Sequence, residues 1–244
     1  LCIIAHFLVL ALMEIALCLL HKENDIKQNA CVIQMNNLIK AGEAKIIDEI
    51  EYPKKLKIDG DVNSTKHILP LSYTALLFFS YGSGQKYIES SIKNGIPKKR
   101  IIVIDNRLFK LFTSSDKNER PVYEMMTKLI ERFCEDKNSE NFVIQKYRFE
   151  ELVKQECHSF VIKNCAIFLD AKDTPVKSFV TYLNSDQNIT SNVFTKSAFA
   201  VYEIVDKNYM SMLNGEFDTM YHLLCQHMDF CEELPLLALM PLQE

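Results

Sequence analysis

Short apolar segments alternate with amphipathic segments through the middle of this chain, and this alternation limits the possible folds more than any other feature. Each apolar segment has the length of a strand, and the stretches beside it carry apolar residues at the three- and four-residue spacing of helices. Such alternation predicts an α/β fold with a sheet of mostly parallel strands joined by right-handed crossovers. The expected strands are 69–82, 98–106, 140–147 and 165–169, and the expected helices are 29–50, 85–96, 122–136 and 149–164.

Two of the expected strands end in aspartates. Asp105 closes the second strand, and Asp170 and Asp173 follow the fourth, with Pro175 and Lys177 directly behind them. Open α/β sheets bind ligands at the carboxyl edge of their strands, so we expect Asp105 and Asp173 to face one ligand-binding cleft. The alternative is an ordinary solvated turn, because aspartate and proline are common turn residues.

Composition narrows the classes of protein that fit. The chain has 244 residues, a net charge of −4 and a pI near 5.9, so it lacks the basic surface typical of nucleic-acid binding. The shares of hydrophobic residues (48%) and charged residues (25%) are typical of globular proteins. The length suits one sizeable α/β domain.

The first residues differ from the rest of the chain. Residues 3–20 are almost wholly apolar, and the sequence turns polar directly after them. Eighteen residues at helical rise span about 27 Å, close to the ~30 Å hydrocarbon core of a bilayer, which predicts a membrane anchor. Glu14 argues against this interpretation, because a carboxylate inside a bilayer is costly, and a core helix is the alternative.

The cysteines and two glycosylation motifs bear on the compartment. The eight cysteines include no CxxC pair, which argues against zinc, and six of them follow the apolar segment. An even number beyond an anchor is compatible with a lumen in which disulfides form. The Asn-x-Ser/Thr motifs at Asn63 and Asn188 agree with a lumenal location.

The order of these segments resembles the core-2/I-branching N-acetylglucosaminyltransferase family, which includes the protein xylosyltransferases. The similarity extends over roughly residues 30–240 and is one of pattern. Near the C-terminus, the stretch 227–240 resembles the part of the family that carries an acidic pair before an apolar helix. The other segments that carry the resemblance are Leu69-Pro70-Leu71-Ser72-Tyr73, Ile96-Pro97, Ile104-Asp105, the stretch from Leu169 through Asp173, Pro175, Val176 and Lys177 to Ser178, and 194–214.

The resemblance implies a GT-A-like, Rossmann-type domain that transfers GlcNAc from UDP-GlcNAc to a glycan hydroxyl with inversion, in a β-1,6-branching reaction. Glu233 falls on the family's general base, with Glu232 beside it, and Asp105, Asp173 and Lys177 fall near the donor. The family needs no metal, so no cofactor beyond the UDP-sugar is expected. Its members are type II, single-pass Golgi membrane proteins with a lumenal catalytic domain. The implied division is an anchor at 1–22, a stem with a leading helix at 23–66, and the transferase domain at 67–244.

Three departures from the family lower the expected activity. The chain has no tryptophan, Lys196 stands where the family has glycine, and the sequence ends at Glu244, where the family continues with basic residues that balance the diphosphate. We therefore expect an incomplete donor site and weak or no transfer. The alternatives are a catalytically inactive lumenal binding module of the same fold, a xylosyltransferase-like enzyme, and a cytosolic α/β protein.

Overall fold

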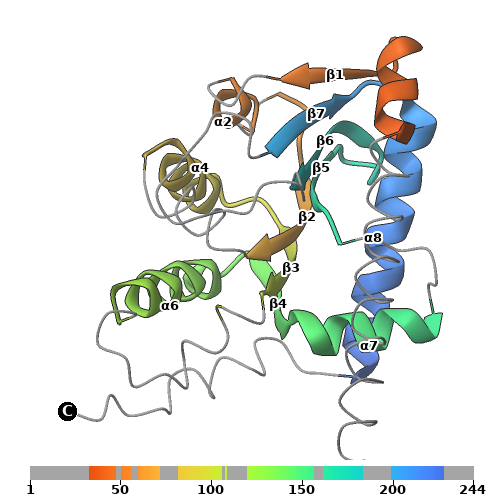
Figure 1. Cartoon of the computed structure of the whole chain (residues 1–244). Coiled ribbons are helices and arrows are strands. Elements are labelled where there is room, and N and C mark those ends of the chain that lie inside the picture. The colour runs from red at the N-terminus through yellow and green to blue at the C-terminus, as the bar shows by residue number, and fades with distance from the viewer. Residues whose placement is uncertain are drawn as a thin grey trace, which may run out of the picture.

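A computed structural model gives the fold of the chain. It contains a mixed seven-stranded sheet with the strand order β1-β7-β6-β5-β2-β3-β4 and helices on both faces (Figure 1). The α/β class predicted from the sequence is therefore confirmed. The structure describes residues 33–47, 51–56, 60–71, 82–105, 108, 120–156, 162–183 and 199–227.

One half of the sheet is parallel. Strand β2 (Ser64–Leu71) is followed by α4 (Gly82–Lys93), and β3 (Lys98–Ile104) is followed by α6 (Arg120–Glu135) and then β4 (Ser139–Gln145). β3 pairs in parallel with β2 on one side and with β4 on the other. The long helical crossovers explain this arrangement, because parallel neighbours cannot be joined by a tight turn.

The other half is antiparallel. After α7 (Lys146–Glu156), β5 (Asn164–Leu169) lies beside β2 in the opposite direction, and β6 (Pro175–Leu183), β7 (Phe199–Ile204) and β1 (Ala44–Ile47) continue the sheet. Each of these strands is antiparallel to its neighbours. The prediction of a mostly parallel sheet is therefore wrong, since four of the six strand pairings are antiparallel.

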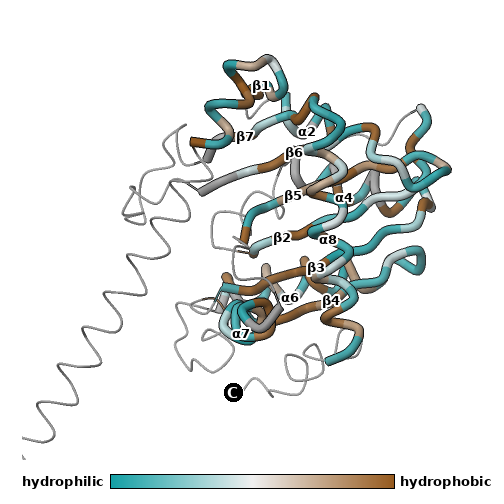
Figure 2. Tube along the Cα trace, turned by 90° about the vertical axis from the view of Figure 1, so that its right-hand side faces the viewer, coloured by the Kyte–Doolittle hydropathy of each residue, from teal (hydrophilic) through white to brown (hydrophobic). Residues whose placement is uncertain are grey.

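Helices cover both faces. α7 and α8 (Lys207–His227) pack with the helical residues 33–40 on one face, and α2 (Tyr52–Lys55), α4 and α6 lie on the other. Figure 2 shows that the middle of β3 is apolar, as expected for a strand enclosed on both faces. The side chains of Ile101 and Val103 point to α8's face, and those of Ile102 and Ile104 point to the face of α4 and α6.

Local boundaries differ from the expected ones at several places. The strand expected at 69–82 is β2, which spans Ser64–Leu71, and the helix expected at 149–164 is α7, which spans Lys146–Glu156. The stretch 29–50 was expected to be one helix, but its described part is a helix over 33–40, a turn at Gly42 with φ +77°, and β1. Strand β6 is not among the strands expected from the sequence. β1 and β6 both pair with β7, which lies far from β1 in the sequence.

The expected membrane anchor, residues 1–22, lies outside the described residues. Among the helices that the structure does describe, none has both the length and the apolarity needed to cross a bilayer.

Candidate functional site

Asp105 lies at the carboxyl edge of the parallel half. Its backbone N–H donates a hydrogen bond to the carbonyl of Leu71 at 3.1 Å, so the residue is held beside the last residue of β2. Its side chain is half-buried. This is the position that the sequence predicted for a ligand-binding aspartate.

Asp173 does not join Asp105. Because β5 is antiparallel to β2, Leu169 pairs with Ser64, and the residues after β5 lie where β2 begins. The eight residues of β2 separate the two edges by roughly 25 Å, at about 3.3 Å per residue. The expectation that both aspartates face one cleft is therefore wrong, because it assumed that β5 runs parallel to β3.

The aspartates after β5 form a hairpin turn. The Oδ1 atom of Asp170 accepts backbone hydrogen bonds from Lys172 at 2.8 Å and from Thr174 at 2.9 Å. These bonds, from Thr174 first and then Lys172, hold the pKa of Asp170 below its usual value. Asp173 has φ 57°, a left-handed conformation that aspartate tolerates better than most residues. These carboxylates end the strand because they build the turn to β6.

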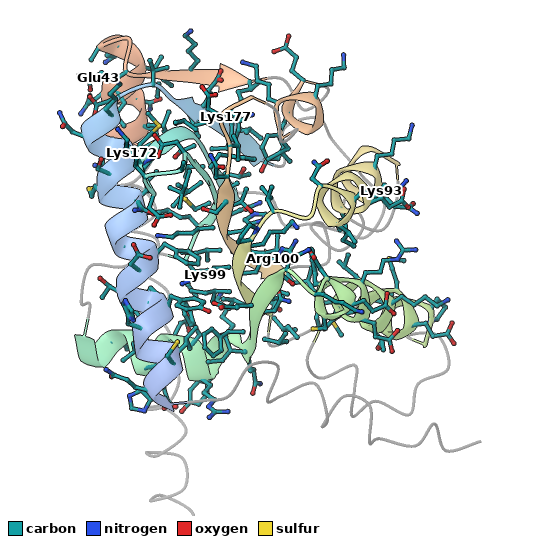
Figure 3. The ribbon with its side chains drawn as sticks, turned by 180° about the vertical axis from the view of Figure 1, so that it is seen from behind. Glu43, Lys93, Lys99, Arg100, Lys172 and Lys177 are labelled. Atoms are coloured by element: carbon teal, nitrogen blue, oxygen red, sulfur yellow. The ribbon has the colours of Figure 1, made fainter. Side chains whose placement is uncertain are left out.

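Lys177 also lies away from Asp105. It is a half-buried residue of β6, and its Nζ is 4.6 Å from the ring centroid of Phe168 and 6.0 Å from that of Phe179. In Figure 3, Lys177 lies beside β6 and β7 and apart from Arg100 on β3. Lys177 thus makes cation–π contacts with two rings of the antiparallel half.

The remaining predicted residues divide by position. Asn63 is described and exposed, directly before β2. Glu232, Glu233 and Asn188 lie outside the described residues, so their places in the fold stay predictions.

A buried charge cluster lies between the parallel strands and α6, and sequence reasoning missed it. Asp136 carries two cationic partners: the Nζ of Lys98 at 3.0 Å and a guanidinium nitrogen of Arg100 at 3.4 Å. The three side chains are 5% exposed or less. Arg100 also lies 4.9 Å from the Phe133 ring centroid and donates to Asn141 at 3.2 Å. Basic residues two apart at the start of an apolar strand were the available signal, because they share a face.

A buried histidine lies near this cluster. The Nε2 of His67 lies 2.8 Å from Oδ1 of Asn164, a hydrogen bond that connects β2 to β5. Burial lowers the pKa of His67 to about 4; the bond to Asn164 opposes this effect, and the charge of Arg100 adds to it. The imidazole is therefore neutral at pH 7.

Further ion pairs join α8 to the sheet. Lys66 on β2 contacts both carboxylate oxygens of Asp218 at 2.6 and 2.8 Å. Lys163, just before β5, lies 2.7 Å from Glu216. Burial by itself would lower the pKa of Lys163, but the attraction and hydrogen bond of Glu216 outweigh it and raise that pKa. These contacts fix the position of α8 on the sheet.

The described residues offer no group of three or more His, Cys, Asp and Glu side chains that could hold a metal ion. Within the same part of the chain, Cys134, Cys165 and Cys225 form no disulfide. Burial raises the pKa of Cys165 to about 12, so this thiol is unreactive in the folded chain. Any disulfide that involves the other five cysteines lies outside the described residues.

Comparisons with known proteins give only distant likenesses. No protein-family model and no curated protein matches the chain. TrmBL2, an archaeal chromatin protein whose structure is described as having a novel mode of DNA binding, is 10% identical with a TM-score of 0.37 over 83% of this chain and 63% of that one. Polyphosphate kinase from Porphyromonas gingivalis is 8% identical with a TM-score of 0.43 over 75% of this chain and 26% of that one.

This chain thus spans less than two thirds of the length of either structure. Scores below 0.5 at these identities support no statement about function.

Proposed function

We propose that the chain is a binding module for a nucleotide sugar, with UDP-GlcNAc as the first candidate ligand, and that Asp105 contacts the ligand. The observation that carries this proposal is the position of Asp105 at the carboxyl edge of β3, beside the end of β2. The unit from β2 through α4, β3 and α6 to β4 supports the finer, Rossmann-type and GT-A-like interpretation of this half.

The sheet changes its winding beside this edge. From β2 the chain passes through α4 and α6 on one face and then through α7 on the other face, and it returns to β5 on the far side of β2. In doubly wound sheets, nucleotides bind at the carboxyl ends of parallel strands such as β2 and β3, close to the point where the chain changes face. Asp173 and Lys177 are no longer part of the proposed site, because they lie at the other edge or on the antiparallel half.

Binding is tested by calorimetric titration of the full chain with UDP-GlcNAc. Asp105→Asn should weaken binding about 10-fold or more, because a charge-assisted hydrogen bond contributes about 1.5–3 kcal/mol. The matched control is Asp173→Asn, which removes the same charge at the opposite edge and should leave the affinity unchanged. The proposal fails if the wild-type chain shows no saturable binding, or if the two variants bind equally well.

Transfer of GlcNAc to a glycan acceptor is the second candidate, and the resemblance of residues 227–240 favours it. The reaction needs a carboxylate to take the proton of the acceptor hydroxyl, which is worth roughly 10²–10⁴-fold in rate, and Glu233 is assigned that role. Incubation with UDP-GlcNAc and glycan acceptors separates the two candidates. If the wild type forms product and Glu233→Gln does not, the chain is an enzyme rather than a binding module. Product that survives this change would refute the assignment of Glu233.

The lumenal Golgi location and the membrane anchor at residues 1–22 belong to the same proposal. Fractionation of cells that express the full chain tests both. Extraction of the protein from membranes by carbonate alone would contradict the anchor.

A further inference from the structure

The motif Asn63-Ser64-Thr65 spans the start of β2, with Asn63 directly before the strand and Ser64 and Thr65 its first two residues, at the edge opposite Asp105. Asn63 is exposed, and its Nδ2 donates a hydrogen bond to the carbonyl of Asp61 at 2.9 Å. An amide nitrogen carries two hydrogens, so this bond leaves one N–H of Asn63 unused by Asp61.

Thr65 differs from Asn63 in its accessibility. Thr65 is only 6% exposed, and its backbone N–H donates a hydrogen bond to the carbonyl of Pro97 at 3.1 Å. Thr65 pairs with Lys98 on β3 and with Phe168 on β5, so it lies between two strands. The backbone N–H of Asn63 is bonded as well, to the carbonyl of Leu169 at 2.7 Å. Once β2 has paired, Thr65 is buried and the backbone N–H groups of Asn63 and Thr65 are both hydrogen-bonded.

We propose that Asn63 carries an N-linked glycan and that the glycan is attached before β2 pairs with β3 and β5. The acceptor motif requires the Ser or Thr at its third position, and here that residue is accessible only in the unpaired chain. In the transfer, Nδ2 forms a bond to the anomeric carbon of a lipid-linked oligosaccharide. The bond from that carbon to the lipid pyrophosphate breaks, and the proton lost by Nδ2 balances the charge of the leaving pyrophosphate. The second N–H of Asn63 stays on the glycosylated nitrogen and donates to the carbonyl of Asp61 once the chain has folded.

The fold accommodates the glycan without rearrangement. Asn63 lies beside the β5–β6 turn, because Ser64 pairs with Leu169 and the turn follows directly. A glycan there covers the edge at which β2 begins and leaves the edge of Asp105 open. Glycans are bulky and solubilising, so this edge of the sheet is excluded as a surface for partner chains. The inference rests on the lumenal location in the proposed function, and it does not depend on nucleotide-sugar binding.

Site occupancy is tested with the full chain expressed in cells with a secretory pathway. Digestion with peptide N-glycosidase should increase gel mobility, and Asn63→Gln should remove one glycan. Thr65→Ala should remove the same glycan, and Thr65→Ser should keep it, which separates loss of the motif from loss of the fold. Asn188→Gln is the control for the second motif and should leave the glycan at Asn63 in place. A mobility that is identical in the wild type, Asn63→Gln and Thr65→Ala overturns the proposal.

The timing is tested with unglycosylated full chain from bacteria. The solubilised oligosaccharyltransferase and a lipid-linked oligosaccharide should modify the chain when it has been unfolded in urea and diluted directly into the assay. The folded chain should remain unmodified. Equal modification of the two samples at Asn63 overturns attachment before strand pairing, and no modification of the unfolded sample overturns Asn63 as an acceptor.

Discussion

An ion-pair cluster in the parallel half and an ion pair in the antiparallel half differ in how far their side chains are exposed to water. In the parallel half, Lys98, Arg100 and Asp136 are enclosed between the strands and α6. In the antiparallel half, Lys55 and Glu203 form an ion pair at 2.5 Å with side chains that are 38% and 21% exposed. Where helices cover a pair of strands, the charged side chains of those strands lose contact with water and need partners inside the protein. Charged side chains at a turn, or on a face that helices cover only in part, keep their contact with water.

Asp136 is the carboxylate that Lys98 and Arg100 share in the enclosed cluster. Burial lowers the pKa of Lys98, and the hydrogen bond and charge of Asp136 oppose this effect. Arg100 draws on the same carboxylate at 3.4 Å. Two buried cations that share Asp136 would lose their common counter-ion in a single substitution, and an unpaired buried charge is strongly unfavourable.

The largest expected effect therefore comes from Asp136→Asn. This change keeps the shape of the side chain and removes its charge, and we expect it to lower the free energy of unfolding by about 3–5 kcal/mol. The matched variant is Asp218→Asn, which removes a carboxylate from Lys66 at a side chain that is 40% exposed. It should cost about 1 kcal/mol or less. Urea unfolding of both variants measures the difference, and equal losses would contradict the contrast between enclosed and exposed charges.

The next effect is acid lability through His67, at the junction of the two halves. The pKa of His67 is about 4 in the folded chain and 6.5 in the unfolded one, so above pH 6.5 both states are neutral there. As the pH falls from 6.5 to 4, only the unfolded chain takes up the proton, and stability falls by about 3 kcal/mol. Below pH 4 this contribution is constant. Unfolding curves from pH 7 to 4 should be flatter for His67→Gln than for the wild type, and parallel curves would refute the assignment to His67.

Sequence patterns predicted β3, β4, α4 and α6 of the parallel half well because their signals are local, whereas β2, expected at 69–82, spans Ser64–Leu71. β3 begins at Lys98, as expected, and α4, α6 and β4 lie within a few residues of their expected bounds. Helical periodicity and apolar runs are visible in a window of ten to eighteen residues, and long crossovers imply parallel neighbours.

The antiparallel half needed information that no short window contains. β1 is four residues long and forms a strand because it pairs with β7, about 155 residues later in the chain. The segment after Leu169 was aligned with a family motif, which hid that Asp170 to Thr174 form a tight turn and that β6 begins at Pro175. Asp105 was placed correctly at a strand end, but its distance from Asp173 depends on the direction of β5. Direction is a property of the whole sheet.

The smallest expected effect comes from substitutions at two residues with left-handed backbone conformations, one in each half of the sheet. Gly95, between α4 and β3, has φ +65°, and a Cβ there would meet nothing closer than the Asn138 Nδ2 at 3.9 Å. Asp173, in the β5–β6 turn, has φ 57°. Gly95→Ala should cost about 1 kcal/mol, because a side chain disfavours this conformation and no clash adds to the cost. Asp173→Gly should either lower the free energy of unfolding by no more than a few tenths of a kcal/mol or raise it. Asp173→Ala should lower it by up to about 1 kcal/mol. Urea unfolding measures all three variants. If Asp173→Gly and Asp173→Ala lost the same free energy, the side chain of Asp173 would stabilise the turn through contacts rather than through its tolerance of the left-handed backbone.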